Sequence, residues 1–279
     1  MEKYSGFFCH VTQGGNFIME KYLTLLKEKI EASDMVLVGI GESFGYTEKQ
    51  ALENKEYSIY FDKLKEENEW AMPYVYAKVA EQETDEKAYL NLAKLLENKN
   101  YFIVSLRTDD LVYKKEFGFK EERIVTPCGG VRKLQCENNC NNDIFEVPSG
   151  VTIALENFWA NPENGLEVPE QKCSECNKNL MFNRMGASKY CEEGYLPMWE
   201  KYTKWLQGTL NHNLCILELG AGMKYPSVIR WPFEKMAFFN KKASIFRVHH
   251  KLYQLTEELS EKGYAVPQHP IEFLSNSFE

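Results

Sequence analysis

Short apolar runs that end in glycine or polar residues recur along this chain, and helix-like stretches separate them. The first run is Met35–Val38, which leads into Gly39, Gly41 and Ser43. Similar runs occupy 101–105, 122–125, 214–219 and 243–248. Runs of this length are typical of strands that are buried on both faces of a parallel sheet. We therefore expect a doubly wound α/β sheet with ligands at the carboxyl ends of its strands.

The stretches between these runs carry helical patterns. Apolar residues recur at helical spacing over 18–30 and 85–96, with Thr84 as the expected N-cap of the second helix. Further helices are predicted near Pro226 and over 251–262, and an aromatic helical face over 195–205. No strong strand pattern interrupts 47–98. This stretch is therefore predicted to be a helical insertion over one edge of the sheet.

Composition narrows the class of partner. The chain of 279 residues is 44% hydrophobic and 27% charged, which is ordinary for a globular protein. Its net charge of −8 argues against a nucleic acid or an anionic membrane as the partner. Neither a secretion signal nor an apolar run of the roughly 20 residues that a bilayer requires is visible. We expect a cytoplasmic protein.

Four of the eight cysteines form two short-spaced pairs. Cys136 and Cys140 make the first, Cys173 and Cys176 the second, and 32 residues separate them. Two such pairs in polar, turn-forming sequence are typical of a tetrahedral zinc site, and the alternative is coincidence among the cysteines. With all four ligand positions filled, the predicted site is closed and structural, and it staples a small lobe at 136–180.

The turn after the first run is a candidate phosphate site. Gly39 and Gly41 let the backbone bend sharply and approach a ligand, and Ser43 adds a hydroxyl. Exposed N–H groups of such a turn can hold a phosphate. The alternative is a plain corner between a strand and a loop.

The order of these parts resembles the sirtuin family, NAD-dependent enzymes with a Rossmann-like domain and a zinc-bearing small domain. The resemblance spans the chain from about Met35 to its last helix. Leu134-Gln-Cys136, Leu217–Pro226 and Ile229–Phe233 are similar to the microbial class M sirtuins. The resemblance implies a Rossmann-like NAD-binding domain at 1–135 and 181–279, with the zinc lobe between. It also implies, for some class M members, transfer of ADP-ribose to protein.

Individual positions follow from this resemblance. Gly39, Gly41 and Ser43 match the turn that grips the NAD diphosphate. Asp109 matches the aspartate beside nicotinamide and its ribose. Two later positions, Gly220 and Gly222, match a second glycine turn near the cofactor.

Three positions depart from the family pattern. Cys128 stands where sirtuins carry the catalytic histidine, Arg107 where they carry asparagine, and His249 where asparagine usually meets the adenine ribose. A thiol is a poor substitute for the histidine base, so deacetylation is not expected. Arg107 suits a phosphate or carboxylate, or simply pairs with Asp109 or Asp110. Cys128 is either catalytic or a small buried filler.

Two hypotheses of function result. The first is a protein ADP-ribosyltransferase that cleaves the nicotinamide–ribose bond of NAD, with Asp109, Arg107 and Cys128 as catalytic candidates and His249 among the cofactor contacts. The second is a lapsed sirtuin-like module that binds NAD, ADP-ribose or a protein partner without chemistry. A zinc hydrolase is disfavoured because all four sulfurs are committed to the metal.

Overall fold

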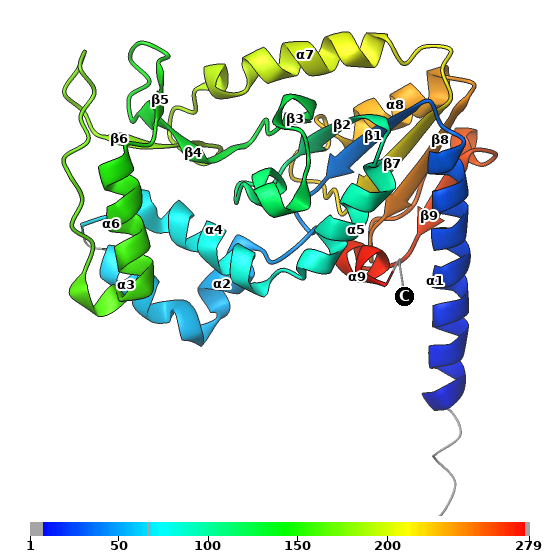
Figure 1. The fold of residues 1–279 in the computed structure, drawn as a ribbon, viewed down its shortest axis with the longest axis horizontal. Coiled ribbons are helices and arrows are strands. Elements are labelled where there is room, and N and C mark those ends of the chain that lie inside the picture. Colours follow the sequence, from blue (N-terminus) through cyan, green and yellow to red (C-terminus); the bar gives the residue numbers. More distant parts are fainter. Residues whose placement is uncertain (1–7, 66, 277–279) are drawn as a thin grey trace, which may run out of the picture. The chain divides into compact units, whose positions relative to one another are not determined.

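A computed structural model of the chain describes residues 8–65 and 67–276 (Figure 1). The helices are α1 (Phe8–Glu31), α2 (Glu48–Glu53), α3 (Ser58–Leu64), α4 (Met72–Glu83), α5 (Glu86–Leu96), α6 (Ser149–Ala160), α7 (Leu196–Gln207), α8 (Arg230–Phe239) and α9 (Pro270–Ser275). The strands are β1 (Met35–Ile40), β2 (Asn100–Ser105), β3 (Ile124–Val125), β4 (Gly129–Cys136), β5 (Ile144–Glu146), β6 (Leu180–Arg184), β7 (Leu214–Leu219), β8 (Ala243–Val248) and β9 (Gly263–Val266).

The larger sheet confirms the predicted fold class. Its strand order is β3-β2-β1-β7-β8-β9, and the pairs β2/β3, β7/β8 and β8/β9 are parallel. All five predicted strands are present. The order reverses direction between β1 and β7, and ligands of doubly wound sheets bind beyond the carboxyl ends of strands at such a switch point. Each of these two strands ends in one of the glycine turns.

The chain divides into two compact units. The first comprises 1–39, 85–102 and 207–279, and the second 40–84 and 103–206. The division into an NAD-binding domain and a zinc lobe at 136–180 follows different bounds and stays a prediction. Within the described part of the chain, every helix is too short or too polar to cross a bilayer.

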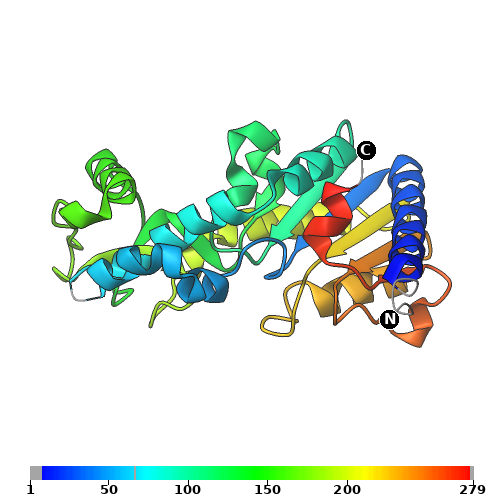
Figure 2. The ribbon, with the colours of Figure 1, turned by 90° about the horizontal axis from the view of Figure 1, so that it is seen from below.

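The first unit is built on β1, β7, β8 and β9. Every residue of β1, β7 and β8 is buried, whereas in β9 only Val266 is. Helix α8 packs on β7 and β8, while α9 packs on α5. In Figure 2, α8 (gold) and α9 (red) lie on opposite sides of these strands. Burial on both faces explains the nearly continuous apolar runs in the sequence.

The second unit contains the antiparallel sheet β5-β4-β6 and the predicted helical insertion, which forms α2, α3 and α4 within this unit. Its core joins apolar residues of α3, α4, α6 and the small sheet, including Phe61, Val75, Phe158 and Phe182. Trp159 stacks on Tyr60 with ring centroids 4.6 Å apart. The zinc-type cysteines Cys136 and Cys173 belong to the same core.

Two local predictions are wrong. Asp85, rather than Thr84, caps α5: its side chain accepts from the N–H of Lys87. Thr84 is buried and accepts from the N–H of Tyr46 instead. The segment 251–262 contains only the short 3₁₀ turn Glu257–Leu259, because side chains from elsewhere take its backbone hydrogen bonds.

Candidate functional site

The sequence predicts Gly39 in the first turn, but the structure places it within β1, whereas Gly45 lies in the turn that follows. Each of these positions requires glycine for a different physical reason. A Cβ on Gly39 would lie 2.6 Å from the ring of Phe233, so this glycine allows α8 to pack closely on β1. Gly45 has a φ of +122° and lies against Thr84 and the Arg107 guanidinium, so both its conformation and its surroundings exclude a larger residue. The glycine pattern thus reflects packing as well as an open turn.

Arg107 links the turn at 42–46 to the segment that follows β2, an arrangement called the Arg107 clip below. Its side chain is 7% exposed, and Nε donates to Oδ2 of Asp109 at 2.6 Å. Nη1 donates to the Glu42 carbonyl at 3.0 Å and Nη2 to the Tyr46 carbonyl at 2.6 Å. Of the alternatives that the sequence left open for Arg107, the structure shows the pairing with Asp109. The guanidinium is a structural link between the turn 42–46 and the aspartate.

Asp109 is held from two sides. Oδ2 faces Arg107, and Oδ1 accepts from the backbone N–H of Leu111 at 3.0 Å. Both oxygens are therefore oriented by the folded chain alone.

Cys128, which the resemblance matches to the catalytic histidine of sirtuins, is 2% exposed. Its carbonyl accepts from the N–H of Met185 at 2.7 Å, and the neighbouring Pro127 carbonyl accepts from the hydroxyl of Tyr190 at 2.9 Å. This tight environment favours the packing interpretation of Cys128. Its assignment as a catalytic residue stays a prediction.

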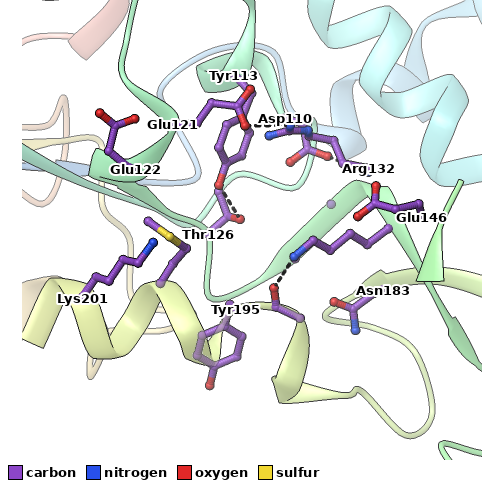
Figure 3. A pocket seen from close by; sticks show the side chains of 15 residues that line it. Asp110, Tyr113, Glu121, Glu122, Thr126, Arg132, Glu146, Asn183, Tyr195 and Lys201 are labelled. Carbon is purple, nitrogen blue, oxygen red and sulfur yellow. Dashed lines mark hydrogen bonds and ion pairs between the residues drawn. The ribbon is translucent and has the colours of Figure 1, made fainter. Parts of the chain in front are cut away.

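A cavity of about 470 Å³ opens within the second unit, beside the backbone of Gly129 and Gly130 (Figure 3). Strand β4 is irregular here, and its pairing with β6 shifts between Gly129 and Leu134. The backbone N–H groups of Val131 and Arg132 donate to Oδ2 of Asp110, at 2.6 and 3.1 Å respectively. Irregular strands of this kind often lie next to functional sites.

Charged and aromatic side chains line this cavity. The Arg132 guanidinium lies 4.2 Å from the ring centre of Tyr113 and donates to Glu121 at 3.0 Å. On the wall just before α7, the carbonyl of Gly194, the last residue of the 3₁₀ turn Glu192–Gly194, accepts from Lys133 at 2.9 Å. Burial raises the pKa of Asp110 to about 6, and the charge of Asp109 adds to the rise. Asp110 is therefore a carboxyl that titrates close to neutral pH.

Sequence reasoning missed three further residues near these positions. Arg184 ends β6 and forms an ion pair with Glu48 of α2. Glu48 also accepts from the Thr108 hydroxyl at 3.0 Å. These three residues come from separate parts of the chain and share no motif, so only the fold brings them together. Asp110 carried a weak signal, as the second aspartate after a buried strand.

The second glycine turn follows β7. Gly220 has a φ of +69°, which favours glycine, and its N–H donates to the Val248 carbonyl at 2.9 Å. His249 follows β8, and its Nδ1 accepts from the N–H groups of Lys251 and Leu252, each at 3.0 Å. The turn and His249 therefore belong to neighbouring strand ends of the first unit.

The four predicted zinc ligands come together. The Sγ atoms of Cys136, Cys140, Cys173 and Cys176 all lie within 4.8 Å of one another. The Sγ–Sγ distances include 3.4 Å for Cys136–Cys176, 3.5 Å for Cys140–Cys173 and 3.8 Å for Cys136–Cys140. Zn–S bonds of about 2.3 Å in a tetrahedron require S···S separations of about 3.8 Å, so the cluster fits zinc.

Comparison with known proteins places this fold. A crystal structure of a Sir2 homologue in complex with NAD covers 91% of this chain and 91% of its own, with a TM-score of 0.55 and 16% identity. A Sir2 homologue variant in complex with ADP-ribose gives a TM-score of 0.55 and 17% identity, covering 91% of this chain and 94% of its own. The chain therefore has the Sir2 fold.

Sequence relatives refine the comparison. A "Probable bifunctional ADP-ribose hydrolase/ADP-ribosyltransferase" of Fusarium oxysporum f. sp. cubense is 25% identical over 242 residues. That match covers 77% of this chain but only 40% of the relative. A "Protein ADP-ribosyltransferase" of Staphylococcus aureus is 21% identical over 267 residues, which are 87% of this chain and 82% of the relative. No family model matches the chain. The chain is thus sirtuin-like in fold and similar in sequence to ADP-ribosyltransferases, as the resemblance to class M sirtuins implied.

Proposed function

We propose that this chain binds NAD and transfers its ADP-ribose group to a side chain of a protein acceptor. The observation that carries the proposal is the clip of Arg107 between Asp109 and the turn 42–46, on a fold shared with a Sir2 homologue solved with NAD. The names of both sequence relatives support transfer as the reaction. Hydrolysis of ADP-ribose is not part of the proposal, because the chain spans 40% of the bifunctional relative.

In this reaction the bond between the nicotinamide nitrogen and ribose C1′ breaks. Its electron pair leaves with nicotinamide, which becomes neutral, and a lone pair of the acceptor forms the new bond to C1′ while the acceptor loses a proton. Positive charge develops on the ribose as the first bond breaks. Asp109, already oriented by Leu111 and Arg107, would position the ribose. Its contact with Arg107 also screens the guanidinium charge from the reacting ribose.

The proposal assigns the remaining cofactor contacts to the two turns. Gly39, Gly41 and Ser43 would hold the diphosphate, and Gly220 and Gly222 with His249 the adenosine half. Zinc at the four cysteines would stabilise the lobe and supply no chemistry to the reaction.

We assign the acceptor to the cavity in Figure 3. Asp110 and Gly129, which line it, directly follow Asp109 and Cys128 in the sequence. The nearly complete burial of Cys128 leaves no exposed base where deacylases carry histidine, so acyl removal is not expected. The net charge of −8 argues against a nucleic acid as the acceptor, and we propose a protein acceptor in a cytoplasmic location.

A second candidate function is binding of NAD or ADP-ribose without chemistry. The observation that favours it is that Arg107 and Cys128, which occupy two family catalytic positions, are both buried within the folded chain.

The deciding experiment measures binding and chemistry separately. Calorimetry with ADP-ribose and NAD reports binding, and chromatography of free nicotinamide, together with label from adenylate-labelled NAD on protein, reports transfer. The variant Asp109→Asn should lose nicotinamide release, whereas Asp62→Asn, an exposed aspartate of α3, should keep it. Binding without release supports the second candidate. Absence of binding excludes both.

A further inference from the structure

Three charged side chains are buried together in the first unit, and a fourth, Glu234, lies beside them with 21% of its side chain exposed. Glu218 lies within β7 and is 0% exposed, and Arg247 lies opposite it on β8 at 1%. Arg230, the first residue of α8, is 8% exposed, and Glu234 follows one turn later. A carboxylate in the middle of an apolar strand is unusual and requires partners.

The charged groups of this cluster are hydrogen-bonded to one another. Arg247 donates to both oxygens of Glu218, from Nε at 2.8 Å and from Nη2 at 2.9 Å, and from Nη1 to Glu234 at 2.6 Å. Arg230 donates from Nη1 to Glu218 at 3.3 Å. Burial raises the pKa of Glu218, and the two arginines oppose that rise. Apolar residues could replace such a cluster at equal or better stability, so stability alone does not account for it.

The remaining donors reach the backbone of two segments. Arg230 donates to the Ala221 carbonyl at 2.8 Å, between Gly220 and Gly222. It also donates from both terminal nitrogens to the Leu252 carbonyl at 3.1 Å. Arg247 donates to the Gln254 carbonyl at 2.7 Å. One buried cluster thus links the turn 220–222 to the segment 249–254.

The segment 249–254 has no regular secondary structure, so its path depends on these contacts. His249 completes them by accepting two N–H groups at Nδ1. Burial, with help from His250 and Arg230, lowers the pKa of His249 to about 4, so the ring is neutral at physiological pH and Nδ1 can accept.

We propose that Glu218, Arg230 and Arg247 are positioning residues for the adenosine half of the dinucleotide, because they hold the turn 220–222 and the segment 249–254 at one fixed spacing. The proposal rests on the proposed function in that it takes NAD or ADP-ribose as the ligand. Arginine is required at 230 because its fork supplies several donors in one plane, whereas lysine offers a single point charge.

The test uses Arg230→Lys, with Arg123→Lys as a matched control outside every site described above. Calorimetry with ADP-ribose and with ADP should show an affinity loss of about tenfold or more, as expected when a bidentate charged contact is lost. Hydrogen exchange of the ligand-free protein should accelerate at amides of 249–254 and 220–222, while amides of β7 keep their protection. Arg123→Lys should change neither affinity nor exchange.

Glu218→Gln, which keeps the side-chain shape, serves if Arg230→Lys does not fold, and it should give the same pattern. Unchanged affinity in the folded variants, or faster exchange throughout the unit, would overturn the proposal, since the cluster would then be merely structural. If the wild-type protein binds ADP-ribose but releases no nicotinamide, the proposed transferase activity is wrong and this inference still holds. Wild-type protein that binds neither ADP-ribose nor ADP would overturn it.

Discussion

Arg107 and Asp109 lie two residues apart after β2 and form an ion pair in which both side chains are less than 10% exposed. The arginine also donates to the carbonyls of Glu42 and Tyr46. The pair therefore ties the first glycine turn to the aspartate that the family resemblance puts beside the ribose. The arginine at the position where the resemblance implies asparagine is thus a structural link between the turn 42–46 and Asp109.

Breaking this pair from one side should be costly. Arg107→Leu leaves the Asp109 carboxylate buried without its partner, which is expected to lower the free energy of unfolding by about 3 kcal/mol. The double variant Arg107→Leu/Asp109→Leu should recover part of that loss. Urea denaturation measures both. Arg132→Leu, which breaks an exposed pair with Glu121, should cost at most about 1 kcal/mol. Strictly additive losses in the double variant would count against the clip.

Zinc should be bound at one ion per chain and should support folding of its lobe. Cys173→Ser should remove the ion and lower the melting temperature by about 10 °C, which corresponds to about 3 kcal/mol for a chain of this size. Mass spectrometry of the metal content and thermal melts test this. Cys215→Ser, in a core strand, should retain zinc, so full zinc content in Cys173→Ser would contradict the assignment.

Asp110 should make stability fall as pH rises. Burial raises its pKa to about 6 in the folded chain, whereas the unfolded carboxyl titrates at about 3.9. Between these values the folded chain holds a proton that the unfolded chain has lost, so this contribution is full below about pH 4 and disappears as pH passes 6. Urea unfolding from pH 4 to 8 should show the trend in wild type relative to Asp110→Asn. Glu122→Gln, at the exposed side of the same cavity, should keep it.

His249 should make stability fall as pH falls, the opposite of the effect of Asp110. Its pKa in the folded chain is about 4, while the unfolded imidazole titrates at about 6.5. The unfolded chain therefore takes up a proton first as pH falls, and stability should decrease by about 2 kcal/mol from pH 6.5 to 4. In His249→Asn this decrease should disappear, and in a variant of the exposed His212 it should persist. An unchanged acid profile in His249→Asn would show that the ring titrates normally.

Patterns local in sequence determined the framework of this protein. Buried strands need continuous apolar runs, so Met35–Val38 and the later runs marked the sheet, and cysteine pairs at short spacing marked the metal ligands. The glycines at the ends of the apolar runs of β1 and β7 indicated the two turns. These features depend only on residues that are close together in the sequence, so a single sequence is enough to reveal them.

Contacts between distant segments decided the rest. Nothing near Arg230 or Glu218 in the sequence indicates that they meet, or that Arg184 reaches Glu48. The segment 251–262 has helical spacing, yet Leu252 and Gln254 give their carbonyls to arginines and His249 takes two of the N–H groups. A backbone whose polar groups are satisfied by side chains does not need the helix, and only the tertiary structure brings those side chains within reach.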